Sequence, residues 1–83
     1  MYEIIQGGVI MKLRLKDLRE DRDLLQKDIA LILKTSQQYY SEYEKGIRLI
    51  PIDRLITLAL FYNTSCDYIL GLTNVNKPYP RTK

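Results

Sequence analysis

Hydrophobic positions recur every three or four residues from Met11 onward, which is the period of amphipathic helices. The first two such segments predict helices over about 12–22 and 26–33. Asp28, in the first turn of the second segment, complements the helix dipole. The apolar residues that share one side of each segment, with Leu25 between the two segments, are Leu15, Leu18, Leu25, Ile29, Ala30, Ile32 and Leu33. Both helices therefore have one face suited to a core.

A third helix is predicted over about 36–45. Ser36 is a good N-cap residue, and Gly46 suits the left-handed position that ends a helix. Tyr40 and Tyr43 share a face at i, i+3 spacing, so we assign both side chains to the core.

Two further helices complete the pattern. Pro51 suits the first turn of a fourth helix, and Asn63 is its predicted C-cap. Its apolar face comprises Leu55, Leu58, Ala59 and Tyr62. Ser65 is the predicted N-cap of a short fifth helix that contains Asp67, Tyr68, Ile69 and Leu70 and stops at Gly71. Five short helices predict an all-α fold, a compact five-helix bundle.

The two ends of the chain lack the helical period. Residues 1–10 contain the pair Gly7-Gly8 and predict at most a short strand from Tyr2 to Gln6. Residues 73–83 hold two prolines and predict a mobile tail. The chain thus divides into an N-terminal extension over 1–10, a domain over 11–72 and the tail.

The origin of the N-terminal extension has two explanations. The residues from Gln6 to Val9 can be encoded by an AAGGAGGTG-like ribosome-binding sequence, which would lie just upstream of the Met11 codon and make Met11 the natural start. Alternatively, the extension is a real strand that pairs with another chain or covers the core. The codons for Gly7-Gly8 distinguish the two explanations.

Composition narrows the functional classes. An 83-residue chain that is 46% hydrophobic supports one small folded domain. Cys66 is the single cysteine and there is no histidine, so neither an intrachain disulfide nor a Cys/His zinc site can form. Because common catalytic motifs are also missing, we expect neither an enzyme nor a cofactor. No apolar run has the length of a membrane span, which favours a cytoplasmic protein without a membrane partner.

The second and third predicted helices form a helix-turn-helix. Only the residues Lys34-Thr35-Ser36 separate them, and the later helix begins with two glutamines, a geometry that lets it enter the major groove of DNA. The net charge of +3 is compatible with such a partner, although charge alone is weak support.

From about Leu13 to Leu72 the chain resembles the lambda-repressor-like, or XRE-family, helix-turn-helix domain. The resemblance rests on Leu15-x-x-Leu18-Arg19, Gln26-Lys27-Asp28-Ile29-Ala30, Ser36-Gln37-Gln38, Tyr43-Glu44-x-Gly46, Leu55-x-x-Leu58-Ala59 and Asp67-Tyr68-Ile69-Leu70-Gly71, in the family's order and spacing. It implies a five-helix lambda-repressor-like bundle, and a salt bridge between Arg19 and Glu44 that orients the first and third helices.

The resemblance also implies the DNA contacts. The predicted base-contacting residues are Gln37, Gln38, Ser41 and Glu42, and the predicted backbone-contacting residues are Gln26, Tyr39, Lys45 and Arg48. A glutamine amide can pair bidentately with adenine, which makes Gln37 and Gln38 the best readout candidates. A carboxylate near phosphates is repelled unless it accepts from a cytosine amine, so base readout and a solvated face remain open for Glu42. Lys34 is a further phosphate candidate.

Three residues depart from the family pattern. Leu25 stands where Ser or Thr usually caps the second helix, and Lys34 stands at the turn glycine, where a side chain costs about 1 kcal/mol. Ile47 replaces a loop residue that is commonly basic. These departures affect the expected DNA affinity more than the fold.

The sequence therefore predicts sequence-specific binding of double-stranded DNA by a transcriptional regulator of phage or bacterial type. We expect a repressor that acts as a homodimer through its fifth helix and C-terminal tail, since one small module contacts few base pairs. No small-molecule ligand is expected. The alternative is a protein-interaction module, antirepressor-like or antitoxin-like, that uses the same fold without reading DNA.

Overall fold

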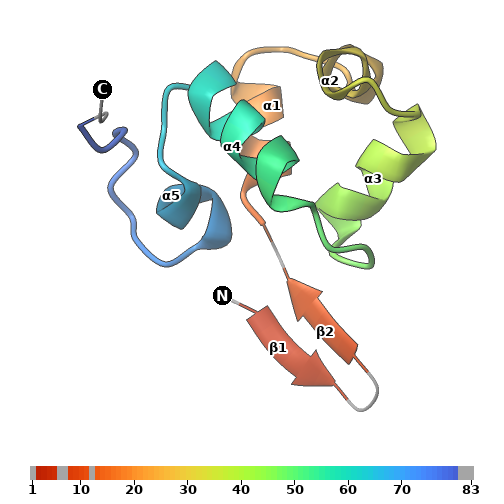
Figure 1. The fold of residues 1–83 in the computed structure, drawn as a ribbon, viewed down its shortest axis with the longest axis horizontal. Helices are drawn as coiled ribbons and strands as arrows, with labels where there is room; N and C mark the ends of the chain where they lie inside the picture. The colour runs from red at the N-terminus through yellow and green to blue at the C-terminus, as the bar shows by residue number, and fades with distance from the viewer. Residues whose placement is uncertain (1, 6–7, 12, 81–83) are drawn as a thin grey trace.

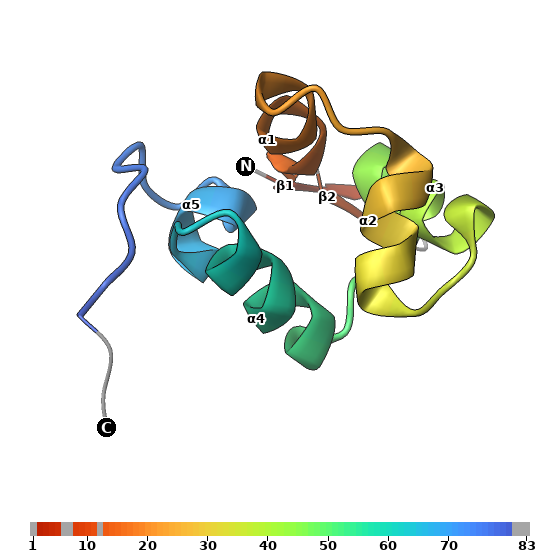
Figure 2. The ribbon, with the colours of Figure 1, turned by 90° about the horizontal axis from the view of Figure 1, so that it is seen from above.

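The computed structural model describes residues 2–5, 8–11 and 13–80. Its helices are α1 (Leu15–Asp21), α2 (Gln26–Leu33), α3 (Gln37–Lys45), α4 (Ile52–Phe61) and α5 (Cys66–Leu70). Two views show α2 and α3 at one end of the helical body and α5 at the other, with α4 between them (Figures 1 and 2). The predicted all-α fold with five helices is confirmed.

One core holds the five helices together. Over residues 13–80, the twelve buried hydrophobic residues come from the helices or the cap of α4: Leu15, Leu18, Ile29, Ala30, Leu33, Tyr40, Tyr43, Leu55, Leu58, Ala59, Tyr62 and Ile69. Ala30 is only 4% exposed, and its small side chain allows the close approach of α2 and α3. Periodicity placed Ile32 on the same apolar face, but its side chain is 37% exposed and lies at the edge of that face.

Helix α1 is shorter than the predicted 12–22. Lys12 lies outside the described residues, and the helix begins only at Leu15. The backbone N–H of Arg14 donates to the carbonyl of Ile69 (2.9 Å), so this residue is tied to α5 in place of extending α1. Long-range contact with α5 thus sets the start of α1.

Several predicted helix ends are seen directly. Ser36 and Ser65 cap α3 and α5, because each hydroxyl accepts a hydrogen bond from the backbone N–H three residues later. Gly46 (φ 77°) and Gly71 (φ 81°) end the same two helices in the left-handed conformation. Pro51 was expected in the first turn of α4 but occupies its N-cap, one residue earlier.

Residues 2–5 and 8–11 form two paired antiparallel strands beside the helical body (Figure 1). Strand β1 (Tyr2–Ile5) falls within the predicted strand, whose last residue, Gln6, lies outside the described residues. Strand β2 (Gly8–Met11) was not predicted, and it crosses the expected boundary between extension and domain at Met11. Its Val9-Ile10 pair has high β-propensity, a signal that the short segment length obscured.

The start of the C-terminal tail contacts the helical body. The Arg14 guanidinium donates to the carbonyl of Thr73 and to the side-chain oxygen of Asn74, both at 2.6 Å. Further along, the Tyr79 hydroxyl donates to the Asp67 carboxylate at 2.8 Å. Residues 73–80 therefore lie along α5, while the mobility of the tail as a whole stays a prediction.

Candidate nucleic-acid interface

The turn between α2 and α3 is built from a left-handed residue and a helix cap. Lys34 adopts the left-handed conformation, with φ 57° and ψ 45°. Glycine adopts this conformation most readily, which is why glycine was expected at this position. Two residues later, the Ser36 hydroxyl accepts from the Tyr39 backbone N–H at 3.1 Å and starts α3. The first turn of α3 therefore projects from the body with Gln37 and Gln38 exposed.

Helix α2 begins without the side-chain cap that its family position usually supplies. Leu25 is the N-cap residue, and its side chain cannot accept a hydrogen bond. The carboxylate of Asp28 supplies the other half of a capping box, because it accepts from the backbone N–H of Leu25 at 2.8 Å. This contact fixes the start of α2, where Gln26 lies.

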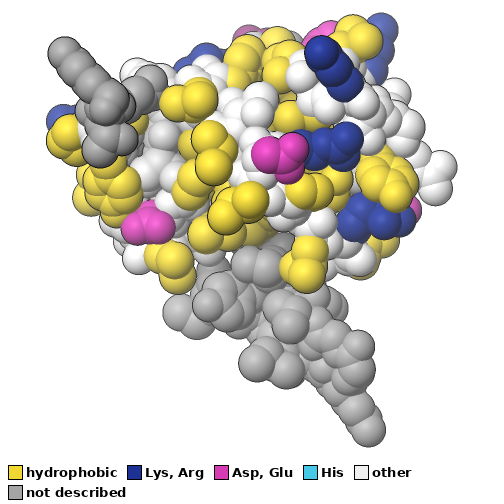
Figure 3. Space-filling view, in the orientation of Figure 1, with side chains coloured by type: hydrophobic (Ala, Val, Ile, Leu, Met, Phe, Trp, Pro, Cys, Tyr) yellow, Lys and Arg dark blue, Asp and Glu magenta, His cyan; other side chains and the backbone are white. Residues whose placement is uncertain are grey.

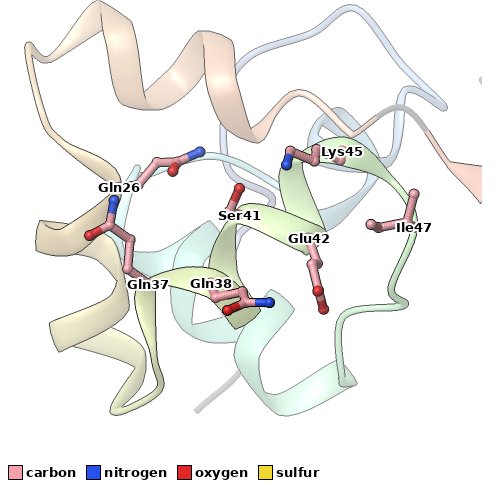
Figure 4. A pocket seen from close by; sticks show the side chains of 7 residues that line it. All are labelled: Gln26, Gln37, Gln38, Ser41, Glu42, Lys45 and Ile47. Atoms are coloured by element: carbon pink, nitrogen blue, oxygen red, sulfur yellow. The ribbon is translucent and has the colours of Figure 1, made fainter.

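Most of the predicted DNA-contacting residues surround one open hollow on the outer side of α3. The hollow has a volume of about 390 Å³ and is lined by Gln26, Gln37, Gln38, Ser41, Glu42, Lys45 and Ile47 (Figure 4). It brings together all four base-contact candidates and two of the four backbone-contact candidates. Tyr39 and Arg48 are not among its lining residues.

An ion pair beneath the hollow joins α1 to α3. Arg19 Nε lies 2.7 Å from one carboxylate oxygen of Glu44, and its terminal nitrogen lies 3.2 Å from the other. The two side chains are only 11% and 4% exposed. This is the pair that the resemblance implies, and its fork geometry fixes the relative orientation of the two helices.

Gln26 is held by the same carboxylate. Its side-chain nitrogen donates to Glu44 at 3.0 Å, which leaves its second N–H and its oxygen available. Burial alone would raise the pKa of Glu44, but hydrogen bonds from Arg19 and Gln26 outweigh burial and lower it. Glu44 is therefore a charged anchor that orients the amide of Gln26 at the edge of the hollow.

Glu42, Arg48 and Tyr39 form a second cluster at the side of α3. Arg48 Nε lies 2.6 Å from the Glu42 carboxylate, and the guanidinium carbon lies 4.0 Å from the centre of the Tyr39 ring. Glu42 is thus paired with a cation of the following loop, and the choice between base readout and a solvated face stays a prediction. Its charge is compensated by a residue that was itself expected to contact phosphate.

Two residues of this region were missing from the predicted contacts. Ile47 lines the hollow with its side chain 66% exposed, and its place directly after Gly46 was the available signal. Arg54 of α4 donates to the Tyr43 hydroxyl at 2.8 Å and so links α4 to the buried side of α3. Nothing in the local sequence of α4 indicated the second contact, since it joins residues from different helices.

Over the described ranges, no cluster of three or more metal-ligating side chains occurs. Among the helices described between residues 13 and 80, none is both long and apolar enough to cross a membrane.

Comparisons with known proteins agree with the geometry of α2 and α3. A family model described as Helix-turn-helix matches residues 15–69. An uncharacterized HTH-type transcriptional regulator of Bacillus subtilis, YobD, is 37% identical over 65 residues, which cover 78% of this chain and 58% of the relative. The HTH-type transcriptional regulator ImmR of the same species is 38% identical over 64 residues, which cover 77% and 50%.

A third relative, an uncharacterized HTH-type transcriptional regulator of Rickettsia conorii, is 31% identical over 68 residues, covering 81% of this chain and 54% of the relative. The chain therefore spans about half the length of the curated relatives it matches. No solved structure matches it.

Proposed function

Because the chain belongs to the XRE-type helix-turn-helix family of transcriptional regulators, we propose that it binds double-stranded DNA sequence-specifically, with α3 in the major groove. The observation that carries the proposal is the hollow on α3, where exposed amides, a lysine and the anchored Gln26 share one surface. Such a surface offers donors for phosphates at its edge and for bases at its centre.

The contacts divide into positioning and reading. Gln26 donates its free N–H to a phosphate, and Lys34 and Lys45 neutralise further phosphates, which fixes the register of α3 on the duplex. Gln37 and Gln38 pair with base edges, preferentially adenine, from the first turn of α3.

Binding is tested by fluorescence anisotropy with random and genomic duplexes at two salt concentrations. We expect binding at low salt that weakens steeply as salt rises, since released counterions contribute to the affinity. Absence of binding at low salt would contradict the proposal. Binding that is equal for all sequences would retain DNA binding and refute base readout.

Base readout is tested with the double variant Gln37→Ala/Gln38→Ala on a duplex selected from a random pool. A bidentate amide–adenine pair contributes about 1–3 kcal/mol, so we expect the operator affinity to fall by about 10-fold or more while helicity is unchanged. Asn76→Ala is the matched control, because it removes an exposed amide outside the hollow; sedimentation velocity verifies that its oligomeric state equals that of the wild type, since Val75 is its neighbour. Equal operator affinity of the double variant and the wild type would refute the assignment.

We further propose that the protein binds a two-fold operator as a homodimer and represses transcription by occupying promoter DNA. The five residues of α5 are buried or half-buried and offer little free surface. The apolar surface of the expected interface therefore comes mainly from the adjoining Leu72, Val75 and Tyr79, each 60% exposed. Figure 3 shows hydrophobic side chains over α4 and α5 on one face. A second candidate for the dimer interface is a row of exposed hydrophobic side chains on α4, which lie at i, i+4 spacing: Ile52, Ile56 and Leu60.

Sedimentation velocity with two charge-introducing variants distinguishes the surfaces. Leu72→Asp/Val75→Asp is expected to dissociate the dimer, whereas Ile56→Asp on α4 leaves it intact. The reverse result would place the interface on α4. A wild-type monomer at concentrations that saturate the operator would refute the dimer.

The alternative function, a protein-interaction module, has its support in the same exposed row on α4. It predicts no duplex binding at low salt, so the anisotropy experiment separates the two functions directly.

A further inference from the structure

Ile47 is an exposed hydrophobic side chain on an otherwise polar surface. It lines the same hollow as Gln38, Glu42 and Lys45, with 66% of its surface exposed (Figure 4). The figure shows the amides of α3 toward one side of the hollow and Ile47 at the other. The hollow therefore has a polar part and an apolar end.

The backbone holds Ile47 in place. Its N–H donates to the carbonyl of Glu42 at 3.2 Å, and the N–H of Gly46 donates to the carbonyl of Tyr43 at 3.2 Å. These two hydrogen bonds are those of a Schellman motif, which extends the order of α3 by two residues. Ile47 is thus fixed to the end of the helix that the proposed function places in the groove.

The residue that usually gives this motif its apolar contact is charged here. In a Schellman motif the side chain after the glycine often packs on the residue five positions earlier, which is Glu42. The Glu42 carboxylate is instead bound to Arg48 at 2.6 Å. The Ile47 side chain consequently points outward, and the neighbouring negative charge is compensated.

The major groove of DNA presents one apolar group, the C5-methyl of thymine. We propose that Ile47 reads a thymine methyl, so that each half-site carries a thymine contacted from the loop in addition to the bases read by the glutamines. This inference rests on the proposed function, and it makes Ile47 a specificity-determining residue at a position that is commonly basic in the family.

The test uses the selected operator with each thymine of a half-site replaced in turn by deoxyuridine, which keeps base pairing and removes the methyl. Burying one methyl-sized group contributes enough to change affinity about fourfold. We expect one thymine per half-site at which deoxyuridine weakens wild-type binding by about that factor. For the variant Ile47→Ala, thymine and deoxyuridine at that site should bind equally.

Leu49→Ala is the matched control, because Leu49 is 63% exposed in the same loop and does not line the hollow. It should keep the full difference between thymine and deoxyuridine. A second variant, Ile47→Lys, should lose that difference and steepen the salt dependence, because it adds a cation near the phosphates.

The outcomes separate the two proposals. If deoxyuridine weakens Ile47→Ala as much as wild type, or weakens neither protein at any site, the assignment of Ile47 is wrong while DNA binding stands. If no duplex is bound specifically by the wild-type protein, the proposed function itself fails, and the inference with it.

Discussion

The inner and outer sides of α3 are built from different kinds of contact. On the inner side, Tyr40 and Tyr43 are 0% and 1% exposed, and their rings meet edge to face with centroids 6.4 Å apart. On the outer side, Gln37 and Gln38 are exposed, and Glu42 pairs with Arg48 of the following loop. The inner side therefore fixes where the helix lies, whereas the outer side can change its chemistry with little effect on folding.

The largest expected effect comes from the inner side. Tyr40→Ala leaves a cavity between α3 and the other helices and should lower the free energy of unfolding by about 3–5 kcal/mol. Tyr39→Ala, one residue away and 44% exposed, should have a small effect on stability. Urea denaturation followed by circular dichroism measures both. Similar losses for the two variants would refute the division of α3 into two sides.

The ion pair that joins α1 to α3 should have the next largest effect. Glu44→Ala leaves Arg19 without its partner in a poorly exposed site and should cost about 3 kcal/mol of unfolding free energy. It also releases the amide of Gln26, so DNA binding should weaken in the fraction that remains folded. A loss of stability without any loss of affinity would show that Gln26 needs no anchor.

The same residue predicts a dependence of stability on pH. Because the pKa of Glu44 is lower in the folded protein than its ordinary value of 4.5, its contribution is complete above that value and is lost as the pH falls toward the folded pKa. Thermal unfolding between pH 6 and 3 should show wild type losing more stability than Glu44→Gln. Parallel curves for the two proteins would contradict this role.

The two left-handed positions that border α3 should give smaller and opposite effects. Lys34→Gly should raise the free energy of unfolding by about 1 kcal/mol, since it removes a side chain from a left-handed residue. Gly46→Ala should lower it by a similar amount, because Gly46 has φ 77°. Thermal denaturation of both variants provides the measurement. A destabilising Lys34→Gly would indicate that the lysine side chain makes a contact of its own.

The smallest effect on stability is expected at the outer side. Glu42→Gln removes the partner of the exposed Arg48, and exposed ion pairs contribute little to folding. It should nevertheless tighten DNA binding and steepen its salt dependence, because it removes a negative charge and frees a cation. Weaker binding by Glu42→Gln would instead support direct base readout by Glu42.

Features of the interface that depend on residues close together in the sequence could be predicted, and features that depend on how the chain folds back could not. The capping of α3 by Ser36 and Gly46 depends on neighbours within the same helix, and it was predicted from the sequence. The pairing of Arg48 with Glu42 and Tyr39 depends on how the loop folds back onto α3, and it was not predicted. The exposure of Ile47 likewise needed the structure, since an isoleucine in a loop is as readily buried as exposed.

The sequence by itself determined the five helices, the identity of the helix-turn-helix and the residues at its surface. Those features follow from helical periodicity, from capping residues and from a family pattern spread over most of the chain. Tertiary structure decided the start of α1 and the arrangement of Gln26, Glu42 and Ile47 around one hollow. Each of these depends on contacts between segments, such as Arg14 with α5 or Arg19 with Glu44, whose distances no local pattern specifies.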